Sequence, residues 1–486
     1  MNTKTVRTRF APSPTGYMHL GNLRTALYAY LIARSMNGKF ILRIEDTDLG
    51  RYIENAVEAI YNTLKIIGLE YDEGPEVGGP FKPYIQSQRK DIYTHYAKKL
   101  IEIGAAYYCF CNKERLDGLR KSAEIKKETF KYDGYCKKLS KQEIQEKLDM
   151  GRPYVIRQVI PKGKTIVKDI LHGTIEVDNE TLDEGILIKS DGLPTYNFAN
   201  VIDDHLMQIS HVIRGIEYLS SAPKYNILYN AFEWEIPEYI HLPLIMKDRT
   251  RKLSKRYGDP SFEDLYYNGF LKEAIVNYIV LLGWSPKDNR EFFTLDELKQ
   301  TFSISGLNKS PAIFDMKKLE WMNGEYIRKL PLEKFNELAI SYYKKVIIRN
   351  DIDFMKLSKL VQLRILILTD IPNLVAFIQE LPNYEASLFI NKKMKSDLNI
   401  SLRTLQWLKE LLIKITNWEH ETIYKSISEE IQAHSLKSSQ VMWPLRTALS
   451  GKEASPGGAI ELAEILGKNE TINRINIGIE KIKAII

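Results

Sequence analysis

A strand, a proline loop, a helix and a second strand follow one another at the start of the chain, and this pattern constrains the fold most. Polar and apolar residues alternate over 5–10 and stop at the turn-forming run 11–16. Apolar residues then recur at helical spacing over 23–31 until an Asn-Gly stop, and a second apolar run covers 40–44. A β-α-β unit has a right-handed crossover, so we expect a parallel sheet with ligands bound beyond the carboxyl ends of its strands.

Two later changes of pattern divide the rest of the chain. Between about 82 and 189, helical stretches, a lysine-rich loop and short strands such as 154–160 indicate an insertion into the first domain, and Ser140 begins a capping box for one of its helices. Apolar residues with turn chemistry at 185–194 return the chain to the sheet. Beyond about residue 315 only helical patterns follow, so we expect an all-α last third.

Composition limits the classes of protein that this chain can belong to. Its 486 residues allow about three domains at roughly 150 residues each, and 44% hydrophobic with 27% charged residues excludes disorder as the main state. It has no membrane-spanning apolar run and no apolar leader, and its odd count of three cysteines does not support a disulfide framework. We therefore expect a cytoplasmic protein, and the net charge of +7 permits a polyanionic partner.

The loop and helix start at 12–22 form the first motif with chemical meaning. A rigid proline turn delivers His19 to the start of a helix, where the helix dipole and free N–H groups favour phosphate. Gly21 lets a nucleotide approach the backbone closely. The alternative is that His19 only caps the helix, and for an isolated His-x-Gly triplet that alternative is the more frequent one.

A basic run at 247–256 forms the second motif. A flexible loop with several lysines and a small hydroxyl residue suits a clamp on polyphosphate, because ammonium groups act as point charges on phosphate oxygens. As an isolated string, such a run is more often a solvated surface segment.

The two motifs together resemble the paired HIGH and KMSKS signatures of class I aminoacyl-tRNA synthetases. Leu20 and Asn22 depart from the first signature, although the Asn22 amide can still donate to a phosphate or ribose oxygen. Leu253 and Arg256 depart from the second signature. The resemblance implies ATP and Mg²⁺ as cofactors and three catalytic residues, His19, Lys252 and Lys255. It also implies an ATP site formed by Pro12, Gly16, His19, Gly21, Asn22, Lys252, Leu253, Ser254, Lys255 and Arg256.

Further blocks of sequence resemble the glutamyl and glutaminyl branch of these enzymes. They lie at 9–16, 43–48, 191–201, 203–205 and 211–215. The resemblance implies an amino-acid pocket lined by Arg9, Ser13, Glu45, Tyr196, Asn200 and Arg214. A free amino acid needs a carboxylate for its ammonium group and guanidinium groups for its carboxylates, which Glu45 and the arginines provide. Taken singly, each of these charges could equally belong to a structural salt bridge.

The helical tail selects glutamate within this branch. Bacterial-type glutaminyl enzymes end in β-barrels, whereas the blocks at 443–451, 455–458 and 465–467 resemble the helical anticodon-binding part of bacterial glutamyl-tRNA synthetases. The resemblance implies that glutamate and ATP form glutamyl-adenylate and pyrophosphate, and that glutamate is then transferred to the 3′-terminal ribose of tRNA(Glu) by a monomeric enzyme. Three alternatives remain at this stage: additional charging of tRNA(Gln), glutamylation of a modified tRNA nucleoside, and a catalytically silent tRNA-binding paralogue.

The expected fold is an α/β Rossmann-type catalytic domain with an α+β insertion, followed by an all-α C-terminal anticodon-binding region. The expected boundaries place the first half of the catalytic domain at 1–81, an inserted acceptor-stem-binding domain at 82–189, the second half of the catalytic domain at 190–246, the KMSKS loop with a stem-contact domain at 247–325, and the anticodon-binding domain at 326–486.

All three cysteines lie within the expected insertion. Cys109, Cys111 and Cys136, with Tyr132, resemble the zinc-binding pattern of some glutamyl-tRNA synthetases, and the resemblance implies a structural zinc with a phenolate as fourth ligand. The alternative is three unligated thiols. The surrounding segment 113–141 has ten Lys or Arg against five Asp or Glu, which favours phosphate contact, although a solvated face is the default interpretation.

Overall fold

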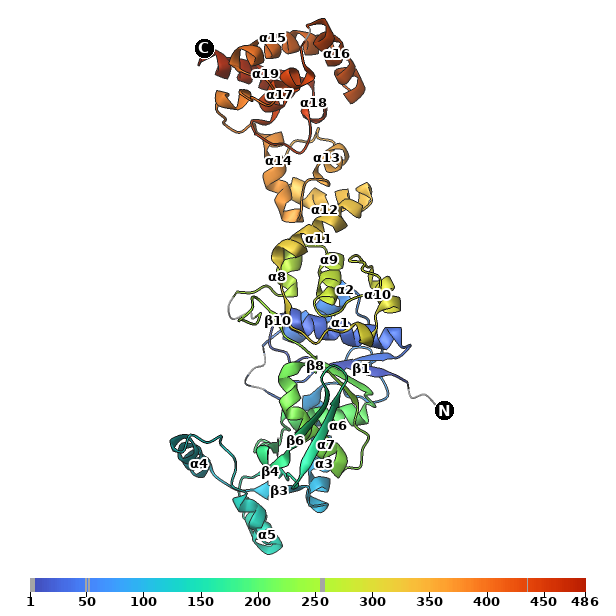
Figure 1. The fold of residues 1–486 in the computed structure, drawn as a ribbon, viewed down its shortest axis with the longest axis vertical. Coiled ribbons are helices and arrows are strands. Elements are labelled where there is room, and N and C mark those ends of the chain that lie inside the picture. The colour runs from blue at the N-terminus through green and yellow to red at the C-terminus, as the bar shows by residue number, and fades with distance from the viewer. Residues whose placement is uncertain (1–4, 49, 51–52, 254–257, 435) are drawn as a thin grey trace. The chain divides into compact units, whose positions relative to one another are not determined.

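The N-terminal β-α-β unit forms where its pattern predicts it. In the computed structural model, which describes residues 5–48, 50, 53–253, 258–434 and 436–486, β1 (Arg7–Phe10) and β2 (Lys39–Leu42) are parallel and are joined through α1 (Leu20–Ser35) (Figure 1). Gly38 allows the chain to turn back into β2, because a Cβ at this position would overlap the carbonyl oxygen of Val6. The end of β1 and the start of α1 therefore lie at the same edge of the sheet.

The sheet continues through strands that are distant from β1 in the sequence. The Ser210 N–H donates to the Arg7 carbonyl oxygen at 2.9 Å, which brings β8 beside β1. β8 and β9 are parallel, β9 meets β5 in parallel, and β6 is the antiparallel partner of β5. The β5–β6 hairpin comes from the stretch expected as an insertion, and it extends the sheet of the first domain. The bounds of these strands are Lys164–Asp169 for β5, Gly173–Asp178 for β6, His211–Gly215 for β8 and Glu238–Leu242 for β9.

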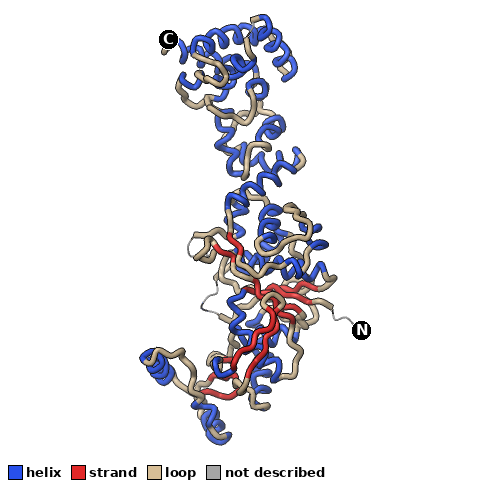
Figure 2. The backbone as a smooth tube through the Cα atoms, viewed as in Figure 1, coloured by secondary structure: helices blue, strands red, loops and turns tan. Residues whose placement is uncertain are grey.

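Helices pack against this sheet and form the first core. Apolar side chains of α3, α6 and α7 meet those of β5, β8 and β9 in one buried cluster, and Figure 2 shows these helices beside the strands. The bounds are Lys90–Glu102 for α3, Tyr196–Leu206 for α6 and Ala222–Ala231 for α7, and α2 covers Ala56–Ile67.

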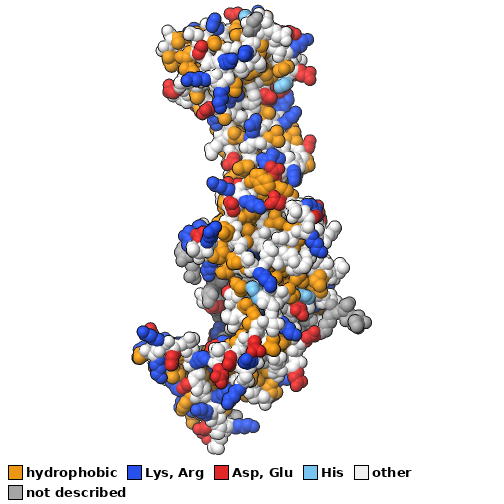
Figure 3. Space-filling model, in the orientation of Figure 1, with side chains coloured by type: hydrophobic (Ala, Val, Ile, Leu, Met, Phe, Trp, Pro, Cys, Tyr) orange, Lys and Arg blue, Asp and Glu red, His pale blue; other side chains and the backbone are white. Residues whose placement is uncertain are grey.

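A small antiparallel sheet carries two solvent-exposed helices. It has the order β3 (Ala106–Cys109), β4 (Val155–Gln158) and β7 (Ile186–Ile188), so the short strand predicted at 154–160 is confirmed. The stretch 185–194 was expected to return the chain to the sheet of the first domain, but β7 belongs to this small sheet instead, because its backbone pairs with β4. The helices are α4 (Lys113–Ile125) and α5 (Lys141–Asp149), and neither buries a residue. The capping box predicted at Ser140 is confirmed, with Glu143 as its second member. Figure 3 shows Lys and Arg side chains gathered over α4.

The described chain divides into two compact units. Residues 1–265 with 275–315 form the first, and 266–274 with 316–486 form the second. The remaining elements of the first half are β10 (Ile245–Met246), α8 (Phe262–Tyr267), α9 (Lys272–Leu281), α10 (Leu295–Thr301) and β11 (Ala312–Ile313).

The second unit is helical throughout its described residues, as its sequence pattern predicts. Its helices share one large apolar core. Gly478 permits close packing there, since a Cβ at this position would lie 3.2–3.3 Å from Phe389, Ala448 and Leu405. No helix in the described part of the chain is long and apolar enough to cross a membrane. The helices are α11 (Met316–Lys329), α12 (Leu332–Tyr343), α13 (Phe354–Val361), α14 (Ile371–Gln379), α15 (Leu398–Lys414), α16 (His420–Ala433), α17 (Ser438–Ser450), α18 (Ala459–Leu466) and α19 (Lys468–Lys483).

Candidate active site

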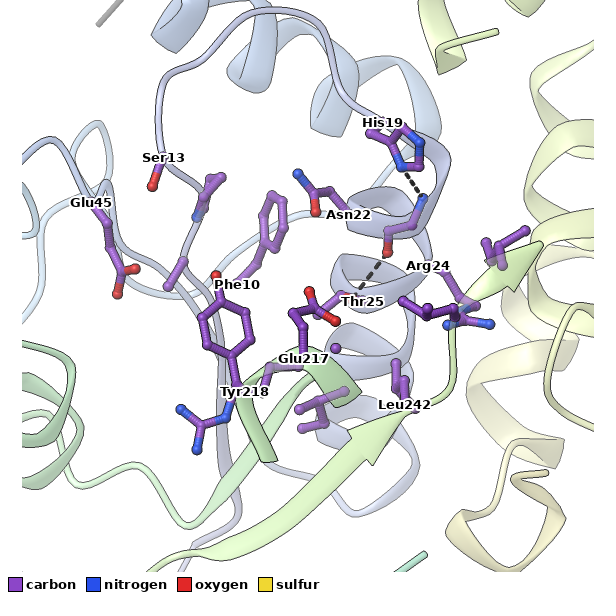
Figure 4. A pocket seen from close by; sticks show the side chains of 18 of the residues that line it. Phe10, Ser13, His19, Asn22, Arg24, Thr25, Glu45, Glu217, Tyr218 and Leu242 are labelled. Carbon is purple, nitrogen blue, oxygen red and sulfur yellow. Dashed lines mark hydrogen bonds between the residues drawn. The ribbon is translucent and has the colours of Figure 1, made fainter. Parts of the chain in front are cut away.

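A single cavity of about 630 Å³ lies beyond the carboxyl ends of β1 and β8 (Figure 4). It brings together most of the residues predicted for the two substrate sites, although they come from distant parts of the sequence. Of the predicted ATP site, the cavity is lined by Pro12, His19, Gly21, Asn22, Lys252 and Leu253. Of the predicted amino-acid site, it is lined by Arg9, Ser13, Glu45, Tyr196 and Arg214.

Some predicted residues do not line this cavity. Gly16 adopts a φ of 105° in the loop before α1, so its role there is conformational. Asn200 lies one helical turn after Tyr196 and donates from its side-chain amide to the Tyr196 carbonyl oxygen at 3.0 Å. Ser254, Lys255 and Arg256, which we predict to contact ATP, lie outside the described residues.

His19 is the N-cap of α1. Its Nδ1 accepts a hydrogen bond from the Gly21 N–H at 3.0 Å, so the capping alternative is correct as far as Nδ1 is concerned. A neutral imidazole whose Nδ1 accepts carries its proton on Nε2. Capping and phosphate binding are therefore compatible, because they use different nitrogens of the same ring.

Glu45 follows β2 at the opposite side of the cavity from His19 (Figure 4). Its Oε1 accepts from the Arg43 guanidinium at 2.8 Å, whereas its Oε2 is buried and has no hydrogen-bond partner among the described residues. Burial raises the pKa of Glu45, and Arg43 only partly opposes that shift. A cation at Oε2 would stabilise the ionised carboxylate.

Arg214 at the end of β8 presents the complementary charge. Its Nε donates to the Nε2 of His241 at 3.1 Å, and its guanidinium lies 4.5 Å from the ring centre of Tyr225. Its Nη2 is buried without a partner in the part of the chain that the structure describes. Buried polar atoms are nearly always hydrogen-bonded, so the unpaired Nη2 of Arg214 and Oε2 of Glu45 together indicate a ligand that carries both charges.

Arg9 is already paired. Its Nε and Nη2 donate to the two carboxylate oxygens of Asp204 at 3.1 and 3.2 Å, and its Nη1 donates to the Ile213 carbonyl oxygen. Burial alone would raise the pKa of Asp204, but Arg9 and Arg43 together lower it. Arg9 therefore takes part in a structural ion pair even though it lines the cavity.

Sequence reasoning missed the role of the adjacent acids on α6. Asp204 holds Arg9 and Arg43, and Asp203 accepts from Arg89 at 2.7 Å. All of these side chains are buried. The signal in the sequence was two successive acids directly after the apolar Val201 and Ile202, because buried acids need cationic partners.

Glu217, Tyr218 and Arg24 also line the cavity and were not predicted. The Glu217 carboxylate occupies the space that a Cβ on Gly215 would need, so a glycine at 215 lets this acid approach the backbone. The Nη1 of Arg24 donates to the Leu282 carbonyl oxygen at 2.8 Å. None of the three positions carries a local sequence pattern that would distinguish it from a surface residue.

The basic run begins on a short hairpin. Lys252 pairs with Met246 in an antiparallel bridge, and the Leu253 N–H donates to the Ile245 carbonyl oxygen at 3.0 Å. Asp248 accepts from the N–H groups of Thr250 and Arg251 and so closes the preceding turn. Lys252 thus combines an exposed side chain with a position on the cavity wall.

The three cysteines form one cluster with Tyr132. Their sulfur atoms lie within 4.8 Å of one another, and the Tyr132 hydroxyl lies 3.4 Å from the Cys109 sulfur and 3.2 Å from the Cys111 sulfur. Three thiols and one phenol in one cluster can supply four ligand atoms, the number that structural zinc requires.

Comparisons with known proteins agree with this geometry. Residues 5–321 match the family described as tRNA synthetases class I (E and Q), catalytic domain, and residues 332–479 match an anticodon binding domain. The glutamate–tRNA ligase of Clostridium novyi is 58% identical over 490 residues, and this alignment covers 100% of both chains. That of Clostridium kluyveri is 58% identical over 479 residues, and this alignment covers 98% of both chains. A crystal structure of a glutamate tRNA ligase from Elizabethkingia meningosepticum in complex with its amino acid has a TM-score of 0.91 and 37% identity, and covers 98% of this chain and 99% of that chain.

Proposed function

The chain belongs to the glutamate–tRNA ligases of the class I tRNA synthetases, and from this premise we propose how its residues bind the substrates and support the reaction. The predicted fold class and activity are confirmed: an α/β catalytic domain and an anticodon-binding domain serve an enzyme that joins glutamate to tRNA with ATP. Full-length similarity to these ligases favours this activity over a silent paralogue and over a nucleoside-modifying relative.

Glutamate binds between Glu45 and Arg214 in this proposal. The observation that carries it is a pair of buried atoms of opposite charge, Glu45 Oε2 and Arg214 Nη2. Neither atom has a partner among the described residues, and both residues line the same cavity. The substrate ammonium supplies donors for Glu45, and a substrate carboxylate accepts from the arginine. Ser13 and Tyr196 line the same cavity, and burial raises the pKa of Tyr196, so its hydroxyl remains a donor at neutral pH.

ATP binds toward the start of α1. The Nε2 of His19 and the N-terminal N–H groups of the helix donate to its phosphates, and Asn22 lies in the same wall. Lys252 and Lys255 supply positive charge from the basic run, with Lys255 assigned from its motif alone. ATP is used as its Mg²⁺ complex, in which the ion neutralises phosphate charge.

The proposed reaction needs positioning more than proton transfer. The α-carboxylate of glutamate is already an anion and attacks the α-phosphorus of ATP, and pyrophosphate leaves to give glutamyl-adenylate. Charge that develops on the phosphate oxygens is stabilised by His19 and the lysines. A ribose hydroxyl at the tRNA 3′ end then attacks the activated carbonyl and releases AMP.

The basic segment near the cysteines is our proposed contact for the acceptor stem of tRNA. α4 and α5 bury no residues, and the segment 113–141 has a local excess of positive charge. An exposed basic helix pair suits the phosphate backbone, which dominates nucleic-acid affinity. We also propose the boundaries 82–189 for this acceptor-stem-binding domain, 247–325 for the stem-contact domain and 326–486 for the anticodon-binding domain.

Pyrophosphate exchange tests the proposed function directly. We expect exchange with glutamate but not with glutamine, and only when tRNA(Glu) is present. Charging of tRNA(Glu) and tRNA(Gln) measured side by side then defines the tRNA specificity. Comparable exchange rates with glutamine would contradict the proposed selectivity for glutamate.

We propose that Cys109, Cys111, Cys136 and Tyr132 hold a structural zinc ion. The purified protein should contain stoichiometric zinc by elemental analysis, and Cys136→Ala should lose it, because structural zinc needs four ligands. Tyr132→Phe removes only the phenol oxygen and should bind zinc more weakly than the parent. A zinc-supplemented parent protein that contains no zinc would contradict the proposal, as would full retention by Cys136→Ala.

A further inference from the structure

We infer that His241, held by Asp169, is a positioning residue that orients the Arg214 guanidinium toward the substrate carboxylate. The inference rests on the proposed role of Arg214 in glutamate binding. It joins three side chains from β5, β9 and β8, two of which contribute nothing to the cavity wall.

The direction of the hydrogen bonds fixes the tautomer of His241. An arginine can only donate, so the Nε2 of His241, which lies 3.1 Å from the Arg214 Nε, must accept. The proton of the neutral ring is then on Nδ1, which lies 2.8 Å from the Asp169 Oδ2. His241 is therefore neutral and donates to Asp169 while it accepts from Arg214.

The hydrogen bonds to Asp169 favour its ionised form. Its Oδ2 also accepts from the His241 N–H at 3.0 Å, and its Oδ1 accepts from the N–H groups of Leu171 and His172 at 2.8 Å. Burial alone would raise the pKa of Asp169, but the hydrogen bond with His241 and the backbone donors lower it. An ionised Asp169 keeps the proton of the imidazole on Nδ1 and the lone pair on Nε2.

Arg214 and His241 face each other across two adjacent strands. They are register partners in the parallel pair β8 and β9, and both are buried. Aromatic rings lie against the guanidinium, with the Tyr225, Tyr239 and Tyr218 ring centres at 4.5, 5.3 and 5.6 Å. The tyrosines constrain where the guanidinium lies, and His241 engages Nε, so Nη2 is the unpaired buried donor.

Protonation of His241 would break this arrangement. A protonated Nε2 would place a donor and a positive charge against the Arg214 Nε. The groups that face His241 are Asp169, Arg214, the Tyr239 ring at 5.7 Å, and His172, whose Nε2 lies 2.9 Å from the His241 carbonyl oxygen. Burial lowers the pKa of His241, and Asp169 opposes that shift only partly. The KM for glutamate should therefore be constant near neutral pH and rise as the pH falls through that lowered pKa.

Two substitutions at His241 separate positioning from packing. His241→Leu fills a similar volume with an apolar side chain and removes the acceptor for Arg214. It should raise the KM for glutamate about 10- to 100-fold, because a hydrogen bond to a charged group is lost. His241→Gln can present its amide oxygen near the Nε2 position and should stay within about threefold of the parent at neutral pH. The KM for ATP should change by less than about twofold in both, because His241 lies outside the proposed ATP site.

The pH profile is the readout that a purely structural role would not move. In tRNA-dependent pyrophosphate exchange measured from pH 7.5 downward, the parent should show a KM for glutamate that rises once the pH is below the ordinary histidine range, and His241→Gln should show a flatter profile. The KM for ATP, measured over the same pH range, reports separately on the proposed phosphate site at His19. Glu45 also titrates beside the substrate ammonium, so the difference between the parent and His241→Gln profiles decides, and identical profiles overturn the inference. If neither substituted protein folds, Asp169→Asn takes their place, because it removes the anion that holds the Nδ1 proton of His241, and an unchanged KM for glutamate in that variant overturns the inference.

The outcomes distinguish this inference from the proposed function. Equal increases in KM for His241→Leu and His241→Gln, or no increase in either, overturn the positioning role. An Arg214→Ala enzyme with an unchanged KM for glutamate overturns the assignment of Arg214 itself. An effect of Arg214→Ala without an effect of His241→Leu overturns only the inference about His241.

Discussion

Arg214→Ala should lower kcat/KM for glutamate by about 100- to 1000-fold and leave the KM for ATP within about twofold. Removing one partner of a buried, hydrogen-bonded charge pair costs about 2–5 kcal/mol, and every 1.4 kcal/mol is about tenfold. Arg214 Nη2 is buried and has no partner in the part of the chain that the structure describes, so a substrate carboxylate there pairs with a donor that the described residues do not use. Initial rates of pyrophosphate exchange over a range of glutamate concentrations at saturating ATP, and over a range of ATP concentrations at saturating glutamate, both with saturating tRNA, give the two constants.

Arg214→Lys is the matched variant for this prediction. Lysine keeps the positive charge, but a single ammonium group cannot reproduce the fork that spans His241 and the cavity. We therefore expect a kcat/KM for glutamate that lies between those of the parent and of Arg214→Ala. Melting temperatures of both variants control for folding, because removal of a buried guanidinium also leaves the acceptor on His241 unpaired. Wild-type glutamate saturation in Arg214→Ala would contradict the site.

The site could be predicted from the sequence where local pattern and topology coincide. The β1 strand, the proline loop and the α1 start are adjacent in the sequence, and a β-α-β crossover places them at the carboxyl edge of a parallel sheet. Glu45 follows β2, and Arg214 lies at the carboxyl end of β8, which is beside β1, so the same rule brings them to the same edge. The cavity that contains them therefore follows from motif order and strand direction.

The pairing of buried charges could not be predicted, because it depends on contacts across long stretches of chain. Arg9 and Asp204 are 195 residues apart, and Asp169 and His241 are 72 residues apart. Sequence alone predicted Arg9 as a partner for the substrate, whereas in the structure each of its three guanidinium nitrogens donates to a protein atom. The β5 strand joins the catalytic sheet, and no periodicity distinguishes that outcome from a strand confined to an insertion.

His19→Asn should reduce the rate of adenylate formation by about 100- to 1000-fold with little change in melting temperature. Loss of one donor to a developing oxyanion costs about 2.7–4 kcal/mol in transition-state stabilisation. Asparagine is among the preferred N-cap residues, so it can keep the bond that the Nδ1 of His19 now accepts from Gly21. It is shorter than histidine and does not reach the position of Nε2. Single-turnover pyrophosphate release measures the chemical step.

Comparison with His19→Ala separates the two roles of this side chain. Alanine removes the cap as well as the donor, so it should show the same catalytic loss together with a helix-capping loss of about 0.5–2 kcal/mol. Ser140→Ala is the control for capping alone, since Ser140 caps α5, a helix that buries no residues, and it should leave adenylate formation unchanged. If His19 acted only as a cap, His19→Asn would retain the parent rate and His19→Ala would lose stability alone. The Nδ1 bond to Gly21 leaves Nε2 as the protonated nitrogen of a neutral ring, and this is why we expect the catalytic loss in both variants.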